Sequence, residues 1–168
     1  MEAPPDQVDT SVHIKQTSKT KLPDGRNSLL IDLGSRINII GCETEREFAL
    51  EAERNGHQTS YEKRTHRLNV NGVGAGSAPC DYTATTPVAV AFRGEGASLH
   101  DFKANIATGS GAHLPAIMGS ISMQEKDSVL ILRKGKEILA FPGEGGYRIE
   151  WSPGTKLLPM TQPLKDIW

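Results

Sequence analysis

Ser28-Leu29-Leu30-Ile31-Asp32-Leu33-Gly34-Ser35 is the stretch of sequence that decides the fold of this chain. Its apolar first half has the composition of a buried strand, and Gly34-Ser35 predicts a tight turn directly after it. A second apolar run, Ile37-Asn38-Ile39-Ile40, follows the turn, so both sides of the turn are predicted to be buried. Asp32 therefore places a carboxylate at the point where a buried strand becomes a turn.

Two segments further along the chain complete a pattern. Asn71-Gly72-Val73-Gly74-Ala75-Gly76-Ser77 is rich enough in glycine to form a hairpin tip. Leu114-Pro115-Ala116-Ile117-Met118-Gly119 repeats the outline of a hydrophobic pair followed by glycine. In this order, the Asp32 turn and these two segments resemble a retropepsin, the retroviral type of aspartic protease domain. The resemblance covers residues 28–141 and implies a closed β-barrel that acts as one half of a homodimer.

The resemblance also implies a chemistry. Peptide hydrolysis by carboxylates needs two of them around one water, and two carboxylates about 3 Å apart share a proton. The chain has one Asp-x-Gly-Ser sequence, and Asp24-Gly25-Arg26 lacks a preceding apolar strand. A second copy of the chain is therefore expected to supply the other Asp32. The implied enzyme is an aspartic endopeptidase that cleaves extended peptides or polyprotein junctions and needs no metal or organic cofactor.

The remaining candidate site residues support Asp32. We expect the Gly34 amide and the Ser35 hydroxyl to donate hydrogen bonds to the Asp32 carboxylate. The glycine-rich segment is predicted to be a flap that closes over the substrate and binds its main chain as an added strand. The resemblance gives the strand that ends at Gly119 a structural role beneath the catalytic turn. The candidate residues are Leu33, Gly34 and Ser35 in the turn, Gly72, Val73, Gly74 and Ala75 in the flap, and Ile117, Met118 and Gly119 below the turn.

Leu33 departs from the family pattern, which has a threonine or serine between the aspartate and the glycine. In the family that hydroxyl bonds to the partner's loop across the dimer, and leucine cannot make this bond. Two interpretations stay open: other contacts hold an active dimer, or the chain is a catalytically inactive retropepsin-like module that dimerises or binds peptides. A third interpretation is a β-rich structural fragment with an incidental turn motif.

The rest of the pattern predicts a mainly β protein with one helix. Thr44-Glu45-Arg46-Glu47 has the form of a capping box and predicts a helix over residues 45–55, inserted relative to compact viral proteases, that stops at Gly56. Residues 57–66 are expected to form a loop. Strands are predicted by alternating or continuous apolar runs at Arg67–Val70, Val88–Phe92, Phe102–Ile106, Val129–Leu132 and Ile138–Phe141.

Three regions are expected along the chain. Residues 1–27 are too polar to bury much surface and are interpreted as a disordered tail or linker. Residues 28–141 are the predicted retropepsin-like domain. Residues 142–168 are rich in proline and glycine and are interpreted as a C-terminal extension with one strand near Tyr147–Trp151.

Composition argues against several classes of protein. The 168 residues carry 19 Lys and Arg and 20 Asp and Glu, a formal net charge of -1, so no basic field would attract nucleic acid. No apolar run is long enough for a membrane span and the first residues do not resemble a signal peptide, so we expect an intracellular, cytoplasmic protein. Cys42 and Cys80 are expected to be free thiols, and no Cys/His spacing predicts a metal site.

Overall fold

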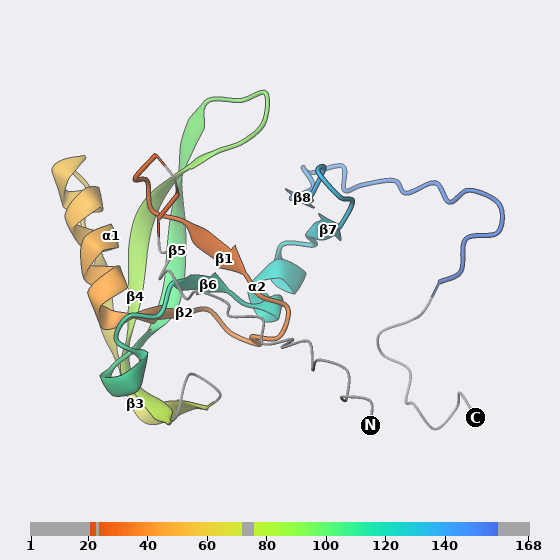
Figure 1. Ribbon diagram of the computed structural model, residues 1–168. Helices are drawn as coiled ribbons and strands as arrows, with labels where there is room; N and C mark the ends of the chain where they lie inside the picture. The colour runs from red at the N-terminus through yellow and green to blue at the C-terminus, as the bar shows by residue number, and fades with distance from the viewer. Residues whose placement is uncertain (1–20, 23, 72–75, 158–168) are drawn as a thin grey trace, which may run out of the picture. The chain divides into compact units, whose positions relative to one another are not determined.

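The computed structural model describes residues 21–22, 24–71 and 76–157. The elements follow the order β1 (Leu29–Ile31), β2 (Ile39–Gly41), α1 (Cys42–Arg54), β3 (Ser60–Asn71), β4 (Ser77–Ala91), β5 (Ala97–Ala107), a 3-10 turn at Gly109–Gly111, β6 (Ala116–Met118), α2 (Ser120–Glu125), β7 (Val129–Ile131) and β8 (Ile138–Ala140) (Figure 1). Strands make up 43% of the structure and helices 17%, so the mainly β fold class is confirmed.

Six strands form one open sheet in the order β1-β6-β2-β5-β4-β3, with β1 and β3 at its edges. β1 pairs in parallel with β6, β6 pairs antiparallel with β2, and β2 pairs in parallel with β5. The described residues form this open sheet in place of the expected closed barrel. The two edge strands, β1 and β3, do not pair with each other among the described residues, and a barrel closes only when its edges pair.

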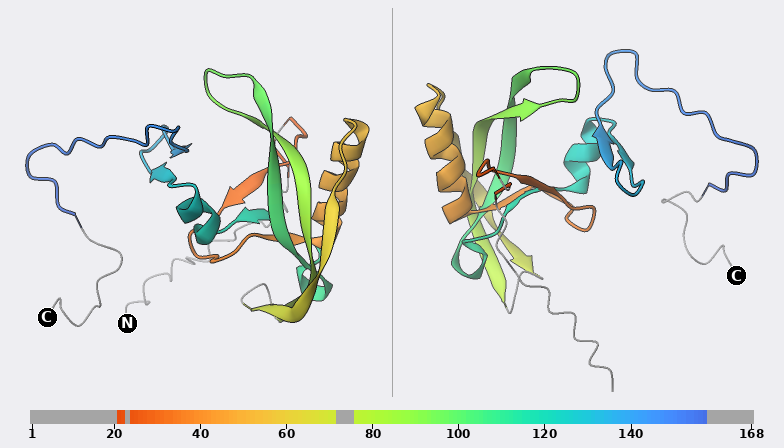
Figure 2. Two further views of the ribbon diagram at one scale, coloured as in Figure 1. Left: turned by 180° about the vertical axis from the view of Figure 1, so that it is seen from behind. Right: turned by 45° about the horizontal axis from the view of Figure 1, so that its top comes forward.

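The three long strands β3, β4 and β5 are antiparallel neighbours. They form a twisted ribbon that runs beside α1 (Figure 2). The strands predicted within β4 and β5 are confirmed, and both are longer than predicted. The loop predicted for residues 57–66 is wrong from Ser60 onward, because β3 already begins there. The strand predicted at Arg67–Val70 is confirmed as the second half of β3. Residues 60–66 have mostly exposed side chains, so the first half lacks the apolar alternation by which a strand is recognised.

The core lies between α1 and one face of the sheet. Its larger cluster joins Phe48 of α1 to Ile40 of β2 and to apolar residues of the long ribbon and β6, namely Ala84, Phe102, Ala104, Ile106 and Ala116. A smaller cluster is formed by residues of β2, β4 and β5, namely Ile39, Ala78, Cys80 and Ala107. Cys42 and Cys80 are free thiols, as predicted.

Helix α1 is confirmed, but it begins three residues before its predicted start. Its N-cap is Gly41, which makes no side-chain capping bond, so the predicted capping box is not used. The Ala112 carbonyl accepts instead from the Glu43 amide at 3.0 Å. A Cβ on Gly41 would clash with the same carbonyl oxygen, so the close approach of this loop requires glycine. The helix is followed by Gly56 at φ +81°, the stop that the sequence predicted.

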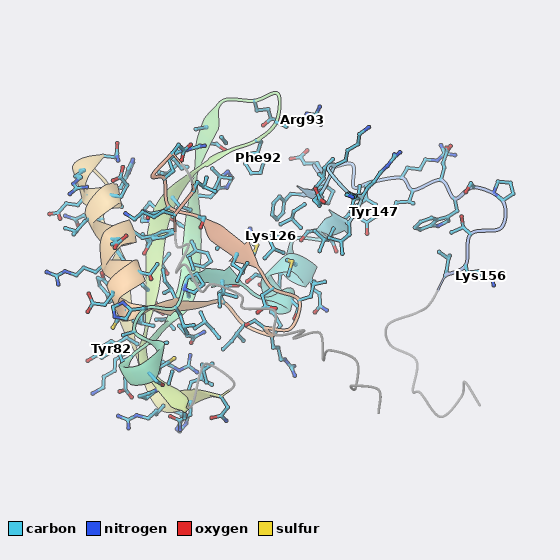
Figure 3. All side chains as sticks on the ribbon, viewed as in Figure 1. Tyr82, Phe92, Arg93, Lys126, Tyr147 and Lys156 are labelled. Carbon is cyan, nitrogen blue, oxygen red and sulfur yellow. The ribbon has the colours of Figure 1, made fainter. Side chains whose placement is uncertain are left out.

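The chain divides into two compact units, Met1–Glu125 and Lys126–Trp168. In the second unit β7 and β8 form the predicted hairpin, and Gly135 in its turn has φ +70°. The strand predicted at Tyr147–Trp151 is not formed, and the only pairing near it among the described residues is a single bridge between Gly143 and Gly146. The side chain of Tyr147, labelled in Figure 3, is 57% exposed.

Candidate active site

The Asp32 turn is built on the end of β1. The prediction that this strand is buried is wrong: Leu29 and Leu30 are exposed and Ile31 is half-buried, because β1 lies at the edge of the sheet. The Asp32 amide donates to the Met118 carbonyl of β6 at 3.1 Å, which continues the parallel pairing of the two strands by one residue. The Ser35 amide then donates to the Asp32 carbonyl at 3.2 Å and closes a four-residue turn. Asp32 is half-buried at this position. Both backbone groups of the aspartate are therefore fixed, one by the sheet and one by the turn.

The Asp32 carboxylate is oriented by the turn itself. The Gly34 amide donates to Asp32 Oδ1 at 2.8 Å, as expected from the sequence. A Cβ on Gly34 would lie 3.1 Å from the same oxygen, so a larger residue would crowd this bond. The expectation for Ser35 is wrong: its hydroxyl donates to the Ile37 carbonyl at 2.7 Å. A serine hydroxyl in a turn readily reaches a nearby backbone carbonyl, and here that local bond is made.

Helix α2 holds the far side of the turn. The Ser120 amide donates to the Ser35 carbonyl at 2.8 Å, and the Ile121 amide donates to the Arg36 carbonyl at 3.0 Å. The Ser120 hydroxyl donates to the Ser35 carbonyl as well, at 3.2 Å. These are the first amides of a helix, which have no partner within the helix, so the loop after Asp32 satisfies them. The sequence did not predict α2, because six residues are too few to show a helical period.

Strand β6 passes beneath the turn in the position expected for Ile117, Met118 and Gly119. Its three residues are all buried, and it lies between β1 and β2. A Cβ on Gly119 would lie 2.5 Å from the carbonyl carbon and oxygen of Ile37. Backbone atoms cannot move aside as the end of a side chain can, so any larger residue at position 119 would push the loop after Asp32 away. Glycine at this position therefore allows the strand and the loop to pack against each other.

The structure brings together two of the three predicted groups of residues. Asp32, Leu33, Gly34 and Ser35 form the turn, and the strand that ends at Met118 supports it. The predicted flap residues Gly72, Val73, Gly74 and Ala75 lie outside the described residues. Leu33 is 60% exposed, directly beside the aspartate.

Asp24 does not offer a second catalytic carboxylate. Its Oδ2 pairs with Arg26 Nη2 at 2.7 Å, and both side chains are exposed in a surface turn. The hydrogen bonds from Arg26 lower the pKa of Asp24, which keeps this carboxyl ionised. Among the residues that the structure describes, no three His, Cys, Asp or Glu side chains are grouped to hold a metal ion.

Sequence reasoning missed Asn38. Its amide donates to the Lys103 carbonyl of β5 at 2.8 Å, and its Oδ1 accepts from the Gly119 amide at 2.9 Å. One side chain thus joins β5 to the end of the strand beneath the turn. The signal was present, because an asparagine inside the apolar run Ile37-Asn38-Ile39-Ile40 needs hydrogen-bond partners when that run is buried.

Comparison of the chain with protein-family models, with curated proteins and with solved structures found no match in any of the three. No helix in the described part of the chain is both long and apolar enough to cross a membrane.

Proposed function

We propose that this chain is a retropepsin-like aspartic endopeptidase that acts as a homodimer, with one Asp32 from each copy. The observation that carries the proposal is the Asp32 turn, in which the Gly34 amide orients the carboxylate at 2.8 Å. A half-buried aspartate whose main chain and carboxylate are both fixed is pre-organised for chemistry. In the surface turn at Asp24 the Arg26 amide also donates to Oδ1, at 3.2 Å, but Asp24 is exposed and its carboxylate is paired with the Arg26 guanidinium.

The proposed reaction uses a water held between the two Asp32 carboxylates. The ionised member of the pair takes a proton from the water, and the oxygen of that water attacks the scissile carbonyl carbon. The protonated member donates a hydrogen bond to the carbonyl oxygen, on which negative charge develops. The pair is active only when it holds one proton, so activity is expected to rise and then fall with pH.

Exposed leucines around the aspartate support a second copy at this site. Leu29, Leu30 and Leu33 are 39%, 49% and 60% exposed, and they lie on or next to β1, an edge strand of the sheet. Exposed apolar side chains on an edge strand are typical of a contact surface. In the proposed dimer these leucines pack against the partner copy, and the substrate is an extended peptide or the junction of a polyprotein inside the cell.

Peptide cleavage by matched variants tests the proposal. The natural chain is incubated with a diverse peptide library at about pH 4 to 7, the range in which a shared-proton pair is active. We expect cleavage by the natural chain and by Asp24→Asn, and none by Asp32→Asn. Cleavage that persists in Asp32→Asn at the same sites and rate would show that Asp32 is not the catalytic group.

A second candidate function is a retropepsin-like module that binds peptides or dimerises without cleaving them. The observation that favours it is Leu33, an exposed apolar side chain where the family has a hydroxyl. The variant Leu33→Thr separates the two candidates. If a folded, dimeric natural chain cleaves no peptide and Leu33→Thr does, the natural chain is the non-catalytic module.

A further inference from the structure

A network of side-chain hydrogen bonds joins β3 to the loop after Asp32. The Arg64 guanidinium of β3 donates from Nη1 to Asn105 Oδ1 on β5. The Asn105 side-chain amide donates to the Asn38 carbonyl at 2.9 Å, and the Asn105 main-chain amide donates to the same oxygen at 3.0 Å. Asn38 in turn bonds to the Gly119 amide at 2.9 Å and to the Lys103 carbonyl at 2.8 Å.

Arg64 reaches this network because β3 is irregular at that point. The register between β3 and β4 shifts between Lys63 and Leu68, so the residues from Arg64 to Arg67 bulge out of the regular ladder. A bulge can redirect a side chain, and Arg64 is half-buried and points to Asn105. The other arginine of the bulge, Arg67, forms a surface pair with Asp81, with Nε 2.7 Å from Oδ1.

Arg67 is paired with a carboxylate, whereas Arg64 is bonded to neutral groups. No carboxylate lies within salt-bridge distance of Arg64 in the described residues, where its hydrogen bonds go to Asn105 Oδ1 and the His66 carbonyl. A hydrogen bond from a cation to a neutral amide is stronger than one between neutral groups. Asn105 is 9% exposed, and both its side-chain oxygen and nitrogen are bonded. A buried amide with both ends bonded can take few other orientations.

The network reaches the catalytic turn through Gly119. The next residue, Ser120, donates to the Ser35 carbonyl, and the Met118 carbonyl on the other side of Gly119 accepts from the Asp32 amide. Each link from Arg64 to the Asp32 turn is therefore a hydrogen bond, the atoms of one asparagine, or one peptide unit. β3 is also the strand that leads into the predicted flap.

We propose that Arg64, Asn105 and Asn38 are positioning residues that fix the Asp32 turn relative to β3, the strand before the predicted flap. Their role in catalysis rests on the proposed function of Asp32. The coupling of β3 to the turn does not rest on the proposed function, because the hydrogen bonds that make it are present in the folded chain whether or not Asp32 is catalytic. The two parts can therefore be tested separately.

The coupling is tested by nuclear magnetic resonance of Arg64→Gln with Arg67→Gln as the matched control. Both variants remove one positive charge from the same bulge, but only Arg64 belongs to the network. In Arg64→Gln we expect amide exchange at Gly119 to become about tenfold faster and the Gly34 resonance to shift. In Arg67→Gln we expect changes around Asp81 and none at Gly119 or Gly34. Equal effects of the two variants at Gly119, or none in either, would overturn the proposal.

Asn38→Asp gives a second test that preserves the shape of the side chain. It keeps the acceptor for the Gly119 amide and loses the donor to the Lys103 carbonyl. If the network acts as a unit, the effects of Arg64→Gln and Asn38→Asp on Gly119 exchange will not add in the double variant. Strict additivity would mean that Arg64 and Asn38 act independently, which contradicts the network.

The catalytic part is tested by steady-state kinetics on a peptide that the natural chain cleaves. We expect Arg64→Gln to lower kcat about tenfold with KM changed less than twofold, because a displaced carboxylate weakens the transition state more than substrate binding. Arg67→Gln is expected to match the natural chain. Equal kcat values for the two variants would remove the positioning role. Absence of cleavage by the natural chain would contradict the proposed function and leave the resonance experiment to decide the coupling.

Discussion

Strands β2 and β6 of the six-stranded sheet and strands β7 and β8 of the C-terminal hairpin are alike in sequence but differ in burial. All four have three residues, and nearly all of these residues are apolar. Every residue of β2 and β6 is buried, whereas no residue of β7 or β8 is. Apolar composition alone therefore did not decide which strands form the core.

The neighbours of each strand explain this difference. β2 and β6 are interior strands of the six-stranded sheet, and α1 packs on the larger core cluster to which they contribute. β7 and β8 pair with each other alone among the described strands. A two-stranded sheet by itself is marginally stable in water, whereas three or more strands with a helix packed on them form a stable core. The Asp32 turn is bonded to one of these buried strands, because the Asp32 amide donates to the Met118 carbonyl of β6.

The largest effect is expected from truncating a core side chain of β2. Ile40 is 2% exposed, so Ile40→Ala leaves a cavity and is expected to lower the free energy of unfolding by about 4 kcal/mol. Leu139→Ala in half-buried β8 is the matched control, with an expected loss of less than about 1 kcal/mol. Urea unfolding of both variants measures the difference. Equal losses would mean that the hairpin is as well packed as the sheet.

A smaller loss of stability is expected from a methyl group added beneath the turn. In Gly119→Ala the new Cβ meets the Ile37 backbone at 2.5 Å, and the strain is expected to cost about 3 kcal/mol. In Gly135→Ala of the β7–β8 turn the new Cβ has open space, and the φ of +70° accounts for a cost of about 1 kcal/mol. Thermal unfolding of the two variants compares them. A Gly119→Ala variant as stable as the natural chain would contradict the close packing of β6 on the loop.

The smallest effect concerns a carboxyl buried in the same unit. Glu45 of α1 is 5% exposed and accepts from the Tyr61 hydroxyl at 2.9 Å. Burial raises the pKa of Glu45. The pKa of Tyr61 is raised to about 12, mainly by burial and also by its hydrogen bond to Glu45. Because folded Glu45 keeps its proton at pH values where the unfolded chain has lost it, its contribution to stability falls as pH rises.

The variant Glu45→Gln checks this pH dependence. Glutamine keeps an acceptor for Tyr61 and does not ionise. The free energy of unfolding of Glu45→Gln, relative to that of the natural chain, is therefore expected to increase from pH 4 to pH 7. Urea midpoints at the two pH values measure the change. A relative stability that falls over this range would show that the folded protein favours the ionised form of Glu45.

Much of the fold could be predicted from the sequence because local patterns and packing agree there. Phe48 and Gly56 mark the inner face and the end of α1, and the apolar run before Asp32 marks β1. The start of α1 could not be predicted, because the Ala112 carbonyl that accepts from its first turn comes from a distant loop. The strand predicted at Arg67–Val70 forms the second half of β3, but the first half, residues 60–66, was missed because its polar side chains are mostly exposed and hydrogen bonds to β4 form the strand without an apolar pattern.

The candidate site was predictable to a similar extent. The Gly34 bond to Asp32 follows from sequence neighbours two residues apart, so local reasoning could find it. The Ser35 hydroxyl donates to the Ile37 carbonyl, and the sequence does not say whether it bonds there or to the Asp32 carboxylate. The partners of Asn38 are Lys103 and Gly119, which are far away in the chain and are identified only by the sheet order.

Mixing active and inactive copies tests most directly the central claim that two Asp32 carboxylates from two copies share one water. Natural chain and Asp32→Asn are unfolded together, refolded in varied ratios at constant total concentration, and assayed for peptide cleavage. If each active dimer needs both aspartates, activity follows the square of the natural fraction and is about one quarter at an equal mixture. A linear fall to about one half at that ratio would show that a single copy carries the active site and would contradict the account.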